Sequence, residues 1–169
     1  MNLQLHLVSL AGFAGLMVMA AFDDFRRLVI PNGVVLGLCV LWPLYLATAP
    51  TVTLASSFGA AGCATAVFLV GALLFSRGLI GGGDVKLLAA ATLWAGPGNA
   101  PSLFVLTALL GGLLALVLLS PVGALIMAGR RPVSGLTTSV ATSANPVPVP
   151  YGVAIAAAAV IVMLPSNFT

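Results

Sequence analysis

The chain has 169 residues, of which 61% are hydrophobic and only 5% are charged, and its formal net charge is +3. A soluble domain carries roughly 25% charged residues, so this composition excludes a soluble globular protein and indicates an integral membrane protein. The basic residues flank apolar segments instead of forming one basic face, which argues against nucleic-acid binding. The apolar segments are long and continuous, which predicts membrane-spanning helices.

We expect an all-α fold, a polytopic membrane bundle of about six transmembrane helices that forms a single integral-membrane domain over residues 1–169. The first apolar segment has no basic residue before it, so we interpret it as a retained helix and not as a signal peptide. Pro50 and the sequence AGPGNAP mark two of the turns. The expected spans cover residues 4–22, 33–49, 54–76, 84–96, 102–128 and 150–165.

The basic residues predict the orientation of these helices. They lie in or beside the connections that follow the first, third and fifth expected spans: Arg26, Arg27, Arg77, Lys86, Arg130 and Arg131. With six helices, these connections share one side of the membrane, and the positive-inside rule assigns that side to the cytoplasm. Both termini then face outward, an N-out/C-out topology.

The only acidic residues are Asp23, Asp24 and Asp84, and each lies at the edge of an apolar segment on that same side. A carboxylate at a membrane boundary is costly and indicates a functional site. The glycines at 81–83 allow positive φ angles and place Asp84 in the first turn of a helix, where the helix dipole favours a carboxylate. A simple helix cap is the alternative interpretation of Asp84.

Asp23 and Asp24 point about 100° apart on a helix, so only one of them can face a partner inside the bundle. Both could instead offset the neighbouring Arg26 and Arg27. The chemistry of these residues alone does not choose between Asp23 and Asp24.

Three other polar or turn residues accompany the acids. Pro31 suits the first turn of the second helix, and Asn32 could cap that helix or donate to a substrate carbonyl. Lys86 could extend to the membrane interface, adjust the charge of the acid pair or meet an acidic substrate group.

Two carboxylates and a water molecule suffice for peptide hydrolysis, because one carboxylate can accept a proton from water while the other, protonated, polarises the scissile carbonyl. This chemistry needs no metal and no cofactor. We interpret His6 as an interfacial residue on the opposite side of the membrane, and Cys39 and Cys63 as small core residues. The chain has no CxxC motif, and we expect no metal site.

Three segments resemble motifs of the prepilin peptidases, the intramembrane aspartic proteases of the GxGD type. They are DFRRLVIPN at 24–32, GGGDVKL at 81–87 and PVPYGVAIA at 148–156, so the resemblance covers nearly the whole chain. It implies that Asp24 and Asp84 are catalytic. It also implies that active-site turn or substrate-positioning residues are Gly81, Gly83, Lys86, Pro31, Asn32 and Tyr151.

The resemblance further implies removal of the leader peptide from prepilins or pseudopilins, at the cytoplasmic face of a bacterial inner membrane. The partners would be the leader, the first part of the pilin helix and the lipid bilayer, with no nucleic acid. Larger relatives carry an additional domain with CxxC motifs and methylate the new N-terminus. The chain has no such motifs, so we expect cleavage without N-methylation, as in the minimal peptidases of tight-adherence (Flp-type) pili. The oligomeric state stays open.

Two other classes of protein are compatible with this pattern. Intramembrane acids also build sites in small ion- or proton-coupled transporter subunits, although transporters usually place acids near the midplane and often contain repeats. A non-catalytic assembly subunit would not require both aspartates. The polar segment 129–149 is predicted to be a flexible cytoplasmic loop, with a substrate lid as the alternative.

Overall fold

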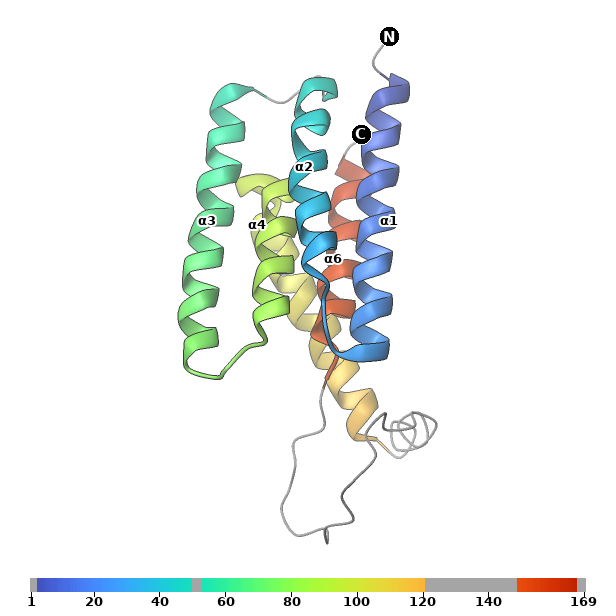
Figure 1. The fold of residues 1–169 in the computed structure, drawn as a ribbon, viewed down its shortest axis with the longest axis vertical. Coiled ribbons are helices and arrows are strands. Elements are labelled where there is room, and N and C mark those ends of the chain that lie inside the picture. The colour runs from blue at the N-terminus through green and yellow to red at the C-terminus, as the bar shows by residue number, and fades with distance from the viewer. Residues whose placement is uncertain (1–2, 50–52, 121–148, 167–169) are drawn as a thin grey trace, which may run out of the picture.

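A computed structural model describes residues 3–49, 53–120 and 149–166. Its elements are α1 (Leu3–Arg27), α2 (Asn32–Thr48), α3 (Leu54–Ser76), α4 (Gly82–Leu119) and α6 (Tyr151–Ser166). Within these ranges every element is a helix, which confirms the all-α prediction (Figure 1). Most of the 129–149 segment, and with it the predicted loop and lid, lies outside the described residues.

Length and apolar composition make three helical segments suitable for crossing a membrane: Gln4–Arg27, Leu54–Ser76 and Gly82–Leu119. The helices Asn32–Thr48 and Tyr151–Met163 are apolar but shorter. Large apolar side chains such as Leu54 and Phe58 are about four-fifths exposed (81% and 77%). Such surfaces suit contact with lipid, where an outward-facing hydrocarbon side chain carries no cost.

The prediction that both cysteines are core residues is wrong. Cys39 is exposed and Cys63 is only partly buried. A small, weakly polar side chain faces lipid about as readily as it packs inside a bundle, so an apolar sequence context does not predict burial here.

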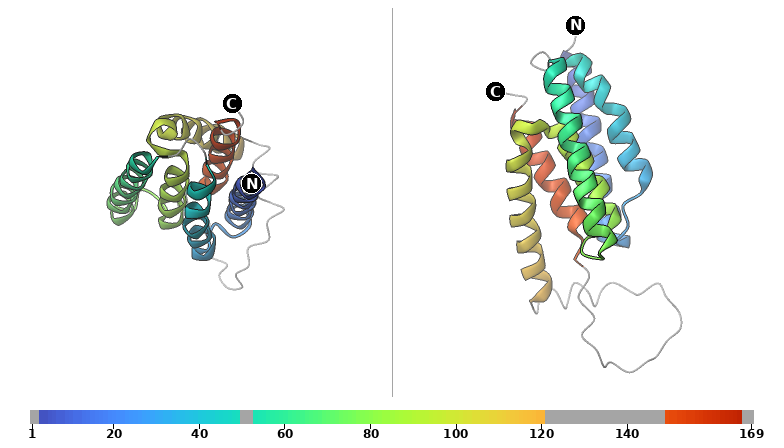
Figure 2. Two further views of the ribbon diagram at one scale, coloured as in Figure 1. Left: turned by 90° about the horizontal axis from the view of Figure 1, so that it is seen from above. Right: turned by 90° about the vertical axis from the view of Figure 1, so that its left-hand side faces the viewer.

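The fourth and fifth expected spans form one element, α4, which is broken at Gly96. Gly96 has φ 71° and ψ 172°, a combination that is essentially restricted to glycine. The chain reverses there, so the arm before Gly96 and the arm after it run in opposite directions (Figure 2). Pro97 begins the second arm, where a missing backbone N–H does no harm, and Pro101 lies about one turn further along it. The described part of this arm ends at Leu119, short of the expected residue 128.

Helix α6 lies against both α1 and α4, α3 packs against α4, and α1 packs against α2 (Figures 1 and 2). The buried face of α6 is built mainly from alanines, among them Ala154, Ala158 and Ala159. Small side chains let helices approach closely in a membrane, where dispersion contacts replace the hydrophobic effect as the force that holds helices together.

An aromatic cluster fills the end of the bundle where α1 begins. Trp94 lies 4.6 Å from the ring centroid of Phe13 and 5.1 Å from that of Tyr45, and its indole Nε1–H donates to the Leu38 carbonyl at 3.0 Å. The ring of His6 stacks on Tyr45 at 5.5 Å. His6 is therefore buried beneath Tyr45. Its position at the membrane interface stays a prediction.

Replacing Gly96 with alanine should destabilise the fold by about 1–3 kcal/mol, because a Cβ atom is strained at this backbone conformation. Thermal unfolding in detergent measures the effect. Gly98→Ala is the matched control, since Gly98 lies two residues away with open space around it and no positive φ. Equal melting temperatures for both variants would contradict the assigned turn.

Candidate active site

The three sequence motifs meet at one end of the bundle. Asp24 lies in the last turn of α1, Asp84 in the first turn of α4, and Tyr151 begins α6. These helix ends lie together at the lower end of the molecule in Figure 1. The structure thus brings the two expected catalytic aspartates to the same end of the bundle, although 60 residues separate them in the sequence.

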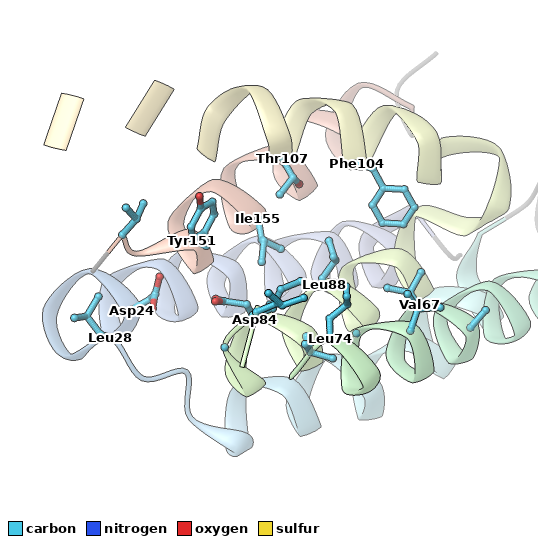
Figure 3. A pocket seen from close by; sticks show the side chains of 18 residues that line it. Asp24, Leu28, Val67, Leu74, Asp84, Leu88, Phe104, Thr107, Tyr151 and Ile155 are labelled. Carbon is cyan, nitrogen blue, oxygen red and sulfur yellow. The ribbon is translucent and has the colours of Figure 1, made fainter. Parts of the chain in front are cut away.

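A cavity of about 890 Å³ opens at this end, and both Asp24 and Asp84 line it (Figure 3). Its remaining walls come from α3, from both arms of α4, from the start of α6 and from the connections beside them. They are almost entirely apolar, and their side chains include Leu28, Val67, Val70, Leu74, Leu88, Phe104, Thr107, Tyr151 and Ile155.

Asp24 is buried, with 5% of its surface exposed. The backbone of α6 approaches it at Gly152, where a Cβ atom would lie 2.8 Å from the Asp24 carboxyl carbon and 2.9 Å from Ile30 Cδ1. A larger residue would therefore force the Asp24 carboxyl group or Ile30 to move. Sequence reasoning missed Gly152, although it follows Tyr151 in the motif that was singled out.

Asp84 is half-buried and is the third residue of α4. The N-cap residue of this helix is Gly81, which has no side chain. The Asp84 side chain folds back toward it, with Oδ2 2.9 Å from the position that a Cβ on Gly81 would take. Figure 3 shows both side chains at the same end of the cavity.

Of the two properties that glycine offers before Asp84, the structure uses close backbone approach and does not use positive φ angles. Gly81 has φ −68°, and the left-handed residue of this turn is Gly78, with φ 71°. Gly78 ends α3 in a Schellman motif, in which the Leu79 N–H donates to the Leu74 carbonyl. Gly83 instead leaves room for Ile30: the Cβ atom of Ile30 lies 3.2 Å from the position that a Cβ on residue 83 would take.

Lys86 and Asn32 contact each other outside the cavity. Lys86 Nζ donates to Asn32 Oδ1 at 3.0 Å on the exposed surface, so this hydrogen bond joins the start of α2 to the first turns of α4. Pro31 is the N-cap residue of α2, and that helix start has no side-chain cap, so Asn32 does not cap it. None of these three residues lines the cavity.

Tyr151 lines the cavity and is 45% exposed. Its ring packs on Gly111 of the second arm of α4, where an added Cβ would lie 2.9 Å from Tyr151 Cε1. Asp23 is half-buried and does not line the cavity, so the geometry singles out Asp24 from the adjacent pair.

Replacing Gly152 with alanine should displace the Asp24 carboxylate and destabilise the protein by about 1–3 kcal/mol, the usual cost of overpacking. Gly112→Ala is the matched control, because nothing lies within 4 Å of its added Cβ. Melting temperatures in detergent compare the two variants. A Gly152→Ala protein as stable as the Gly112→Ala protein would show that α6 does not press on Asp24.

The family comparison agrees with this geometry. A model of the type IV leader peptidase family matches residues 11–116, a region that contains both cavity aspartates. Searches of curated proteins and of solved structures each returned no significant match. Because the matched region covers more than half of the sequence, the chain belongs to the type IV leader peptidase family.

Proposed function

We propose that this protein is an intramembrane aspartic endopeptidase that removes the leader peptide from type IV prepilins or pseudopilins, with Asp24 and Asp84 as its catalytic pair. Membership of a peptidase family supports the reaction class. The observation that carries the proposal is that two aspartates from separate motifs line one largely apolar cavity.

In the proposed reaction, an ionised carboxylate of the pair accepts a proton from water, and the water oxygen attacks the scissile carbonyl carbon. The second carboxyl group, protonated, donates a hydrogen bond to the carbonyl oxygen and stabilises the tetrahedral intermediate. A proton then passes to the leaving nitrogen and the C–N bond breaks. Like charges held close cannot both ionise easily, so one shared proton suits the pair.

The apolar walls of the cavity are evidence that the substrate is an apolar helix. A segment of the substrate that lies in the membrane can contact the side chains of α3 and α4, while its scissile bond reaches the aspartates at the end of the bundle. In this proposal Gly81, Gly83 and Tyr151 shape the site, and the hydrogen bond between Lys86 and Asn32 holds α2 near the start of α4.

We place the site at the cytoplasmic face of the inner membrane, with both termini outside. The basic residues support this orientation, since Arg26, Arg27 and Arg77 lie at the same end of the bundle as the aspartates. The resemblance of the IPN segment to minimal Flp-type peptidases supports a tight-adherence prepilin as substrate and cleavage without methylation.

The alternative, a small ion- or proton-coupled transporter subunit, is less well supported. Such proteins bind their ions near the midplane at broken helices. Here the broken helix α4 turns at Gly96, and Asp84 lies 12 residues before that turn, at the far end of its first arm.

Asp24→Asn and Asp84→Asn should each lower leader cleavage by at least about 10³-fold, because each removes a proton-transfer group. Purified protein is incubated with a candidate prepilin, and mass spectrometry identifies the new N-terminus. Asp23→Asn is the control and should retain activity within a few-fold. Cleavage that persists in both single variants and in the double variant would eliminate the proposed pair.

Cysteine labelling in intact cells tests the orientation. In a background without Cys39 and Cys63, a membrane-impermeant maleimide should label Thr53→Cys at the start of α3 and should not label Ser76→Cys at the site end. Both positions are exposed. If only Ser76→Cys were labelled, the orientation of the protein in the membrane would be opposite to the one proposed.

A further inference from the structure

We infer that Ile30 is a positioning residue, whose side chain fixes the separation of the Asp24 and Asp84 carboxyl groups. This inference rests on the proposed peptidase function and extends it to a residue to which no argument from the sequence gave a role. Ile30 lies in the connection between α1 and α2, at the lower end of the molecule in Figure 1, and only 7% of its surface is exposed. It does not line the cavity, so it acts through other residues and not on the substrate.

The first contact of Ile30 is with the start of α4. Its Cβ and Cγ1 atoms lie 3.2 and 3.5 Å from the position that a Cβ on Gly83 would take. Gly83 directly precedes Asp84 in the first turn of this helix. The Ile30 side chain therefore packs on the backbone of the turn that carries Asp84.

The second contact of Ile30 is with the start of α6, at the point where α6 meets Asp24. Ile30 Cδ1 lies 2.9 Å from the position that a Cβ on Gly152 would take, and Asp24 Cγ and Oδ2 lie 2.8 Å from that same position. The tip of the Ile30 side chain and the Asp24 carboxyl group thus pack on the same backbone atoms. One buried side chain connects the surroundings of both aspartates.

The connection that carries Ile30 has few conformations available to it. Leu28 has φ 54°, a left-handed conformation that is rare for leucine, and its N–H donates to the Asp24 carbonyl at 2.9 Å. Pro31 disfavours the helical conformation at the residue before it, and Ile30 is not helical. A β-branched side chain also has a restricted χ1 angle. Ile30 is therefore held stiffly, as a residue that sets a spacing must be.

The proposed reaction depends on this spacing. The two carboxyl groups share one proton only when they are held at a short and constant separation. A displacement of about 1 Å at a catalytic group, caused by a change away from the reacting atoms, can lower the rate about 10²-fold. Atoms that hold the start of α4 against the start of α6 therefore contribute to kcat without contacting the substrate.

Ile30→Ala tests the inference, because it removes Cγ1 and Cδ1 and leaves the cavity walls unchanged. With the prepilin used to test Asp24 and Asp84, we expect kcat to fall roughly 10- to 100-fold and KM to stay within about twofold. Ile30→Val loses only Cδ1 and should lower kcat about 2- to 5-fold, since less of the side chain is lost. If the alanine variant does not fold, the valine variant decides.

A second measurement needs no substrate. In the background without Cys39 and Cys63, Asp24→Cys and Asp84→Cys are treated with bifunctional thiol reagents of increasing length. With Ile30 present, one reagent length should give a clearly higher cross-linking yield than the others. With Ile30→Ala the yields should become nearly equal, because the separation of the two positions is no longer fixed.

Leu10→Ala is the matched control, since Leu10 is a buried aliphatic residue of α1 that lies 14 residues before Asp24. That separation is about 21 Å along the helix. The variant should lose at least as much melting temperature as Ile30→Val, yet keep kcat and the preference for one reagent length.

An unchanged kcat in the Ile30 variants, or a fall that Leu10→Ala reproduces, would overturn the inference and leave the peptidase assignment intact. A rise in KM at constant kcat would also overturn it, because that result indicates substrate binding. If the unsubstituted protein cleaves no prepilin, the proposed function fails, whereas the cross-linking series still decides whether Ile30 fixes the separation of positions 24 and 84.

Discussion

The contact between α6 and Asp24 is the constraint on which the site depends. Gly152 brings the backbone of α6 so close to the Asp24 carboxylate that an added Cβ would force the carboxylate or Ile30 to move. The same helix packs its alanine face against α1 and α4, so one close-packed interface holds α1, which carries Asp24, beside α4, which carries Asp84. Each carboxylate lies at a helix end, and the geometry of the pair depends on how these helices are placed.

The reversal at Gly96 has a complementary role. It turns the second arm of α4 back along the bundle, so that the arm reaches the end where the first arm began (Figure 2). The ring of Tyr151 then packs on Gly111 of this arm. Thr107, on the same arm, lines the cavity. Without the reversal the cavity would lack one wall. A single backbone conformation open only to glycine thus determines which side chains face the aspartates.

Much of this arrangement could be predicted from the sequence. Hydropathy predicted the helices to within a few residues at most ends, because apolar segments of this length have few other stable forms in lipid. The rarity of acids and their common position at the edges of apolar segments singled out Asp23, Asp24 and Asp84. The basic residues placed these acids at one end of the bundle, where the structure also places them.

Other features depend on contacts between distant elements and have no local signal. The close approach of Gly152 to Asp24 and the ring of Tyr151 on Gly111 depend on how helices pack. The exposure of Cys39 was predicted wrongly, because lipid-facing and core positions have similar composition in a membrane protein. The glycines at 81–83 were expected to make the turn, but that conformation belongs to Gly78, while Gly83 makes room for Ile30.

The proximity of Asp24 and Asp84 is the claim most directly open to measurement, and it can be tested without any substrate. In a background without Cys39 and Cys63, the pair Asp24→Cys and Asp84→Cys should be joined efficiently by a short bifunctional thiol reagent in membranes. The pair Asp23→Cys and Asp84→Cys should react far less, since Asp23 does not line the cavity. Equal reaction of the two pairs, or no cross-link between positions 24 and 84, would contradict the account.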